Sequence, residues 1–158
     1  MAQEIERKFL VKDQSYRLLA YDKYNIKQGY IANENGRSVR VRITDTEAVL
    51  TIKGPSNSRG ISRYEWTNSI SFDDARDLLK LCQGILIEKV RFLVRSGEHI
   101  FEIDEFIDRN RGLVIAEVEL RSEQEAFIKP DFIDREVTGD RRYYNAYLAR
   151  TPFDRWII

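Results

Sequence analysis

The sequence predicts an α+β protein in which an eight-stranded antiparallel β-barrel forms a tunnel with a polar, charged lumen and helices pack outside. Three observations predict this fold class. Strand-like segments with a period of two recur along most of the chain. Turn residues separate several of these segments. The few helical segments carry apolar stripes, which can cover the apolar faces of the strands from outside.

Eight segments show the residue preferences and alternation of β-strands. Turns rich in Gly, Asn and Ser separate several of them, at 33–36, 54–60, 96–98 and 110–112. We expect strands near residues 3–11, 25–32, 37–44, 47–53, 62–70, 86–95, 98–106 and 113–121.

Helices are predicted in fewer places. Ser71 or Asp73 caps a helix whose buried stripe is Leu78, Leu79 and Leu81. Residues 122–127 resemble a short capped helix, because a Ser precedes a Glu by three positions. Weaker helical patterns occur at 14–22 and 143–149. No Gly/Ser linker divides the chain, so we expect one domain spanning residues 1–158.

Composition excludes several classes of function. Basic and acidic residues are balanced at 26 each, so no global field directs the protein to a nucleic-acid polymer or an anionic membrane. Cys82 is the only cysteine, which excludes an internal disulfide and fits the reducing cytoplasm. The first eight residues contain no apolar h-region, so we expect no signal peptide. No run approaches the ~20 apolar residues of a membrane span.

Charged residues concentrate on one face of each predicted strand. In the first strand, Glu4, Glu6 and Lys8 alternate with apolar and basic neighbours. The other strands place these pairs on one face: Arg40 with Arg42, Thr51 with Lys53, Arg63 with Glu65, Lys89 with Arg91, Glu102 with Asp104, and Glu117 with Glu119.

A solvated outer face over an ordinary core explains any single one of these strands. The set favours a charged lumen for two reasons. Like charges recur as neighbours on one face, as in Arg-Val-Arg and Glu-Val-Glu, and solubility does not require this. The apolar stripes of the helices also need the opposite faces of the strands.

A lumen that carries both signs of charge predicts metal-assisted phosphoryl chemistry. Arg and Lys side chains match a polyanion such as a phosphate chain. Carboxylates would repel that anion unless a hard divalent cation lies between them, and Mg²⁺ or Mn²⁺ is commonly shared by carboxylates and phosphates. Competing motifs are weak. His99, the only histidine, lies beside a hairpin turn, and no glycine-rich phosphate loop is present.

The opening Glu-Ile-Glu-Arg-Lys resembles the ExExK signature of the CYTH proteins, the triphosphate tunnel metalloenzymes. This family includes class IV adenylyl cyclases, thiamine triphosphatases, inorganic triphosphatases and RNA triphosphatases. The opening alone is a weak signal, but further segments resemble the family in family order, and together they span essentially the whole chain. These segments are 26–30, 39–42, 50–54, 87–91, 101–106, 113–120 and 137–145. The resemblance is greatest to the compact bacterial branch.

The resemblance implies an eight-stranded tunnel that binds a triphosphate, and it implies roles for individual residues. Divalent Mg²⁺ or Mn²⁺ would be held by Glu4, Glu6, Asp104, Glu117 and Glu119. Phosphate contacts would come from Lys8, Arg40, Arg42, Lys53, Lys89, Arg91 and Arg141. Catalytic roles fall to Lys8, Lys89, Glu65 and Tyr30, the last being the family tyrosine near a catalytic lysine. Asp104 and Glu65 would hold a second metal or orient water.

One departure from the family pattern concerns this metal chemistry. Many relatives carry an acidic pair two residues apart where this chain has Glu65 and Thr67, and Thr67 supplies no charge. The number of metal ions therefore stays open. For each charged residue the alternative is a salt bridge inside the barrel, and this alternative is strongest for Arg63, Glu102, Arg111 and Arg121.

The resulting first hypothesis is an enzyme that hydrolyses inorganic triphosphate to diphosphate and phosphate. The alternatives are a class IV-type adenylyl cyclase that makes cyclic AMP, a thiamine triphosphatase, and a triphosphate-binding module without catalysis. The partner is in each case a small molecule that contains a triphosphate. Whether the protein forms a homodimer stays open.

Overall fold

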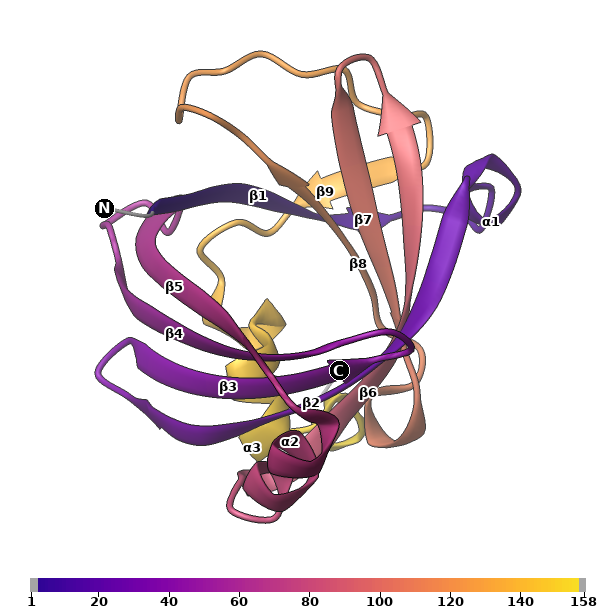
Figure 1. Ribbon diagram of the computed structural model, residues 1–158. Helices are drawn as coiled ribbons and strands as arrows, with labels where there is room; N and C mark the ends of the chain where they lie inside the picture. Colours follow the sequence, from indigo (N-terminus) through magenta and orange to yellow (C-terminus); the bar gives the residue numbers. More distant parts are fainter. Residues whose placement is uncertain (1–2, 157–158) are drawn as a thin grey trace.

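Antiparallel pairing carries the chain around a closed ring of strands, seen end-on in Figure 1. The computed structural model describes residues 3–156. Its strands are β1 (Gln3–Val11), β2 (Asp22–Glu34), β3 (Arg37–Thr44), β4 (Ala48–Ser56), β5 (Ser62–Ile70), β6 (Gln83–Ser96), β7 (His99–Phe106), β8 (Val114–Glu119) and β9 (Ile133–Glu136). All eight predicted strands are present, and β2 and β6 begin about three residues earlier than expected.

The ring closes through β1. The strand order is β5-β4-β3-β2-β6-β7-β8-β1-β9, and an additional pairing joins β5 to β1. On one side Glu6 pairs with Glu119 and Lys8 with Glu117, and on the other Glu4 pairs with Arg63. The predicted eight-stranded antiparallel barrel is therefore confirmed. The sequence did not predict β9, which pairs with β1 outside the ring.

Much of the hydrophobic core lies outside the barrel wall. The outward faces of β1, β6, β7 and β8 share one cluster with side chains of α1 (Tyr16–Leu19) and of the segment before β9. Helix α2 (Phe72–Leu79) covers the outward face of β3 and β4, where Val41 and Ala48 pack with Ala75. The period-two alternation therefore leaves the opposite, charged faces of the strands for the lumen.

Next to the charged part of the lumen lies an apolar layer that we call the apolar floor: Ile87, Phe106, Ile115, Leu148 and Ala149. Three of these residues are the next inward-facing positions along β6, β7 and β8 after the charged residues. The other two belong to helix α3 (Asn145–Arg150), which packs against these strand residues. The floor places the start of α3 beside the charged lumen.

Within residues 3–156 the helices are α1 (Tyr16–Leu19), α2 (Phe72–Leu79), α3 (Asn145–Arg150) and three short 3₁₀ helices, Asp108–Asn110, Arg141–Tyr143 and Phe153–Arg155. Ser71 caps α2 as predicted, accepting a hydrogen bond from the backbone N–H of Asp74 at 3.0 Å. Because α2 ends at Leu79, Leu81 lies beyond it and is exposed, so its predicted place in the buried stripe is wrong.

The helix predicted at 122–127 is also wrong, because this segment consists of turns and irregular backbone. Glu125, expected to cap that helix, instead accepts hydrogen bonds from Arg121 and contacts His99 Nε2 at 2.9 Å. Phe127 packs against Phe9 and Phe101 of the barrel wall. These contacts tie the segment across the outside of the barrel and explain why the local capping signal does not produce a helix.

Candidate active site

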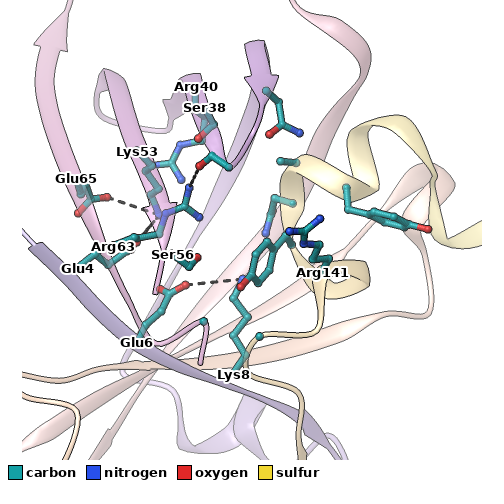
Figure 2. A pocket seen from close by; sticks show the side chains of 18 of the residues that line it. Glu4, Glu6, Lys8, Ser38, Arg40, Lys53, Ser56, Arg63, Glu65 and Arg141 are labelled. Carbon is teal, nitrogen blue, oxygen red and sulfur yellow. Dashed lines mark hydrogen bonds and ion pairs between the residues drawn. The ribbon is translucent and has the colours of Figure 1, made fainter. Parts of the chain in front are cut away.

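A cavity of about 1010 Å³ occupies the lumen and is lined mainly by charged and polar residues. Figure 2 shows Glu4, Lys53 and Glu65 close together on neighbouring strands of one wall. The predicted site residues that line the cavity are Glu4, Glu6, Lys8, Tyr30, Arg40, Arg42, Lys53, Glu65, Lys89, Arg91, Glu117, Glu119 and Arg141. Asp104 is the predicted site residue that does not line it.

The carboxylates of β1 and β8 are crowded on one side of the lumen. Burial raises the pKa of Glu6 well above its usual range, and the nearby charges of Glu117 and Glu4 add to this rise. Burial also raises the pKa of Glu119, reinforced by Glu4 and by other carboxylates. This side of the lumen therefore carries more negative charge than its own cations neutralise.

Two lysines partly compensate these carboxylates. Lys53 Nζ lies 2.7 Å from Glu4 Oε2 and 3.7 Å from Glu65 Oε1. Burial opposes ionisation of Glu4, but the contact with Lys53 outweighs burial and lowers the pKa of that carboxyl. Lys8 Nζ lies 3.5 Å from Glu117 Oε1 and 3.8 Å from Glu6 Oε1. The longer Lys8 distances leave its ammonium group free to donate to another acceptor.

A tighter ionic cluster lies on the side formed by β6 and β7. Asp104 is 1% exposed, and both of its oxygens are engaged: Arg91 donates to Oδ1 at 2.7 Å and to Oδ2 at 2.9 Å. Lys89 Nζ lies 2.7 Å from the same Oδ2. Arg91 also lies 3.0 Å from Glu102. Asp104 therefore binds the side chains of Arg91 and Lys89 beneath the surface of the cavity. Its role as a metal ligand stays a prediction.

The arginines of β3 are cations with few counterions. Burial lowers the pKa of Arg42 to about 9, and Arg40 and Arg91 add to this effect. Arg42 Nε donates to Gln28 Oε1 at 2.7 Å, and Arg40 donates to Thr51 Oγ1 at 3.3 Å. Within residues 3–156, Arg40 Nε is buried without a hydrogen-bond partner. Such a donor facing a charged cavity is suited to binding an anion.

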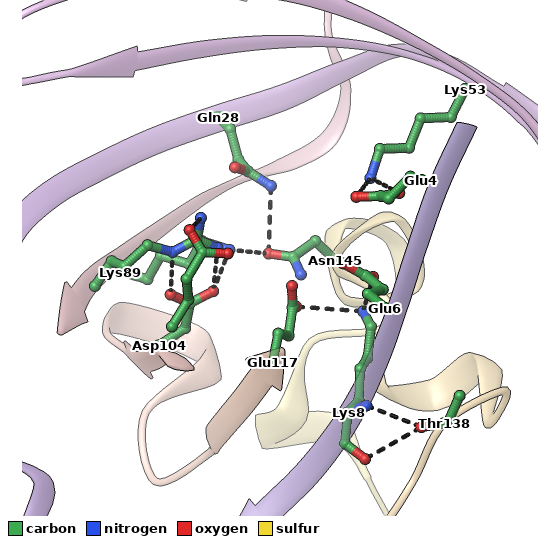
Figure 3. A network of polar contacts seen from close by, with 12 residues as sticks. Glu4, Glu6, Lys8, Gln28, Lys53, Lys89, Asp104, Glu117, Thr138 and Asn145 are labelled. Atoms are coloured by element: carbon green, nitrogen blue, oxygen red, sulfur yellow. Dashed lines mark hydrogen bonds and ion pairs between the residues drawn. The ribbon is translucent and has the colours of Figure 1, made fainter. Parts of the chain in front are cut away.

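The sequence analysis missed three residues near the predicted lysines: Asn145 and Tyr144 contact a lysine directly, and Gln28 contacts Asn145. Asn145 accepts a hydrogen bond from Lys89, Gln28 donates to Asn145, and the ring of Tyr144 lies 4.8 Å from Lys8 Nζ. Figure 3 shows Gln28, Asn145 and Lys89 as one connected network. Gln28 was detectable as a polar residue on the inward face of β2. Tyr144 and Asn145 lie outside the strands, so no alternation placed them in the lumen.

Other predicted residues take places that their sequence positions left open. Tyr30 joins the network through Gln28, whose Nε2 lies 3.4 Å from Tyr30 Oη. Thr67 lies on β5, and its hydroxyl is 3.0 Å from that of Thr51. Arg141 lies at the edge of the cavity and is exposed. Arg63 donates to the backbone carbonyls of Gly54 and Gly36 and not to a carboxylate. The alternative role of Arg63, a salt bridge inside the barrel, is therefore wrong.

The donor set on the β1–β8 side has the chemistry that a hard divalent cation requires. Its oxygen atoms belong to carboxylates. Burial, reinforced by neighbouring carboxylates, raises the pKa of Glu6 and of Glu119, and a bound cation would favour the charged form of both. Among the residues that the structure describes, no three His, Cys, Asp or Glu side chains are already arranged as a metal-binding group. The carboxylates have the chemistry that the ion requires, and two of them, Glu4 and Glu117, already contact Lys53 and Lys8.

Comparison with known proteins agrees with this fold and cavity. The family model of the CYTH domain matches residues 2–144. A protein from Acetivibrio thermocellus named inorganic triphosphatase is 44% identical over 97% of both chains. A second inorganic triphosphatase, from Nitrosomonas europaea, is 33% identical over 92% of this chain and 96% of its own. The crystal structure of an inorganic triphosphatase superposes with a TM-score of 0.63, at 32% identity, over 92% of this chain and 97% of that chain.

The chain belongs to the CYTH family, a class of proteins built on a closed tunnel of antiparallel strands. The resemblance seen in the sequence is thereby confirmed. None of the helices between residues 3 and 156 has the length and apolar character needed to cross a membrane.

Proposed function

We propose that this protein is a triphosphatase that hydrolyses inorganic triphosphate to diphosphate and phosphate in a divalent-metal-dependent reaction. The observation that carries the proposal is the cavity itself, where cations with few counterions face a crowded set of carboxylates. A polyanion bridged to the carboxylates by a cation satisfies both groups at once. The two curated relatives named above, both inorganic triphosphatases, support the same substrate.

The proposed cofactor is Mg²⁺ or Mn²⁺, held by oxygen atoms of Glu4, Glu6, Glu117 and Glu119. When bound, such an ion polarises a phosphoryl oxygen and neutralises part of the charge on the substrate. Glu6 and Glu119 are the strongest candidates, because burial and neighbouring carboxylates raise their pKa values and a bound cation would offset both effects. Glu4 would have to release part of its contact with Lys53.

The remaining charged residues bind and orient the triphosphate. We assign Lys8, Lys53 and Lys89 together with Arg40, Arg42, Arg91 and Arg141 to its phosphate oxygens. Positive charge held in a buried lumen stabilises the charge that develops as the bond to the diphosphate leaving group breaks. Because both oxygens of Asp104 are occupied by cations, Glu65 is the better candidate to orient the water that attacks phosphorus.

The test is phosphate release by the purified protein from inorganic triphosphate, with and without Mg²⁺ or Mn²⁺. ATP, GTP and thiamine triphosphate serve as competing substrates, with every product identified. We expect metal-dependent formation of diphosphate and phosphate, and loss of turnover in Glu6→Gln. Cyclic AMP from ATP would identify a cyclase instead, and tight triphosphate binding without turnover under either metal would identify a binding module.

A further inference from the structure

The side-chain oxygen of Asn145 lies where the start of α3 meets the barrel (Figure 3). Asn145 Oδ1 accepts a hydrogen bond from Lys89 Nζ at 2.8 Å and one from Gln28 Nε2 at 3.2 Å. Asn145 is 9% exposed, Lys89 is 1% exposed and Gln28 is fully buried. Because breaking a buried hydrogen bond leaves a polar group unsatisfied, these three side chains constrain one another.

These contacts fix the orientation of the Lys89 ammonium group. A protonated lysine has three N–H donors. One points to Asp104 Oδ2 at 2.7 Å and a second to Asn145 Oδ1 at 2.8 Å. Lys89 also lines the cavity. The two buried acceptors therefore leave its third donor for a group inside the lumen.

Gln28 extends this arrangement to the neighbouring strand β3. Its Nε2 donates to Asn145, while its Oε1 accepts a hydrogen bond from Arg42 Nε at 2.7 Å. Gln28 belongs to β2, which lies between β3 and β6 in the sheet. One amide pair thus connects a cation of β3 with a cation of β6, and it determines which donors of each remain available.

The packing of α3 against the barrel also fixes the position of Asn145. Leu148 is fully buried and Ala149 is 2% exposed, both within the apolar floor. Gly84, with φ +68°, comes so close to α3 that an added Cβ would lie 2.1 Å from the carbonyl oxygen of Ala149. A side chain at this position would push the helix away. The close contact keeps Asn145 at a fixed depth.

We propose that Asn145, supported by Gln28, is a positioning residue for triphosphate hydrolysis, which orients Lys89 so that one N–H is presented to a phosphoryl group of the substrate. This inference rests on the proposed function. It gives a residue of the C-terminal helix α3 a role in the reaction, and the charged pattern of the strands does not predict this role.

The experiment compares Asn145→Leu, which removes the acceptor, with Asn145→Asp, which keeps an acceptor oxygen in the same place. Asn68→Leu, at an exposed position on β5, is the matched control, and thermal melting verifies that each variant folds. Loss of a hydrogen bond to a charged group corresponds to a reduction in rate of about 10- to 100-fold. We expect that loss in kcat for Asn145→Leu, with KM changed less than about threefold, and recovery of most of kcat in Asn145→Asp.

A double variant distinguishes positioning from a general effect on the structure. If Asn145 acts through Lys89, then adding Asn145→Leu to Lys89→Met lowers kcat no further. Multiplicative losses in the double variant, or wild-type kcat in a folded Asn145→Leu protein, overturn the inference while the proposed function stands. Failure of the wild-type protein to release phosphate from triphosphate overturns the proposed function and the inference with it.

Discussion

Lys8 and Lys89 are both buried lysines of the same lumen, yet their surroundings shift their pKa values in opposite directions. Burial disfavours the charged form of Lys8, but Glu117 and Glu6 outweigh it and raise its pKa. At Lys89, burial lowers the pKa to about 7, because Arg91 and Arg42 add to the effect and Asp104 only partly opposes it. The counterions of Lys89 are already shared with Arg91, whereas Lys8 lies among carboxylates in excess.

The difference shows that a charged lumen need not be uniform. The β1–β8 side has more carboxylates than cations, which suits it to a metal ion. The side formed by β3 and β6 lacks negative charge, which suits it to an anion. A metal-bridged polyanion would bring each side what it lacks.

The largest expected effect is on catalysis. Removing either ammonium group, in Lys8→Met or Lys89→Met, should lower kcat/KM for triphosphate by about 100- to 1000-fold, the loss typical of one charge-stabilising donor. The measurement is steady-state phosphate release under saturating Mg²⁺. If one variant keeps activity near the wild-type level, the corresponding side of the lumen does not contact the substrate.

Replacing the two lysines should change the stability of the protein in opposite directions. Lys8→Met leaves Glu6 and Glu117 without their cation and should cost about 2 kcal/mol at pH 7. Lys89→Met removes a cation that burial disfavours, and Asp104 keeps both bonds to Arg91, so we expect the melting temperature to rise by about 2–4 °C. Chemical and thermal unfolding measure both values. A loss of stability in both variants would contradict the comparison.

The gain from Lys89→Met should also depend on pH. An unfolded lysine titrates near ~10.4, while Lys89 in the folded protein titrates at about 7. Between these values the unfolded chain binds more protons, so the stability of the wild-type protein rises with pH through this group. The advantage of Lys89→Met should therefore shrink from pH 7 to pH 10 in urea unfolding. An advantage that stays constant across this range would refute the lowered pKa.

Metal binding should also distinguish the two sides of the lumen, through a change of about tenfold in affinity for Mn²⁺. Because a protonated Glu6 cannot ligate a metal, affinity for Mn²⁺ should fall by about tenfold per pH unit below the raised pKa of Glu6. Calorimetric titration without triphosphate measures this slope. We expect Lys89→Met to retain the slope and Glu6→Gln to lose it. An unchanged slope in Glu6→Gln would place the ion elsewhere.

The smallest effect is expected at Thr67. Thr67→Val breaks the hydroxyl contact to Thr51, which itself accepts a hydrogen bond from Arg40. The expected cost is about 1 kcal/mol in stability, with KM for triphosphate raised less than about threefold. Kinetics and thermal melting measure the two effects. A change above tenfold in kcat would show that this wall takes a direct part in the chemistry.

The sequence predicted the barrel and most of its lumen because both depend on local alternation. Residues two apart on one strand, such as Glu117 and Glu119, face the cavity, and the residues between them face the core, because side chains alternate along a strand. Asp104 shares this inward face, but its burial behind two cations depends on strand register, which alternation does not reveal. Asn145 comes from a helix packed against the barrel, and Glu125 is captured by His99 from another strand. Such long-range contacts have no local signature, and the extent of the domain, 1–158, stays a prediction.

Closure of the ring through β1 has a consequence for aggregation. Strand β1 carries Glu4, Glu6 and Lys8 and at the same time pairs with the edges of β5 and of β8. If β1 detached, the barrel would become an open sheet with two unpaired edges, each able to recruit a strand from another molecule. The strand that carries the proposed metal ligands Glu4 and Glu6 therefore also protects the protein against edge-to-edge association, so substitutions that weaken β1 would reduce solubility together with activity.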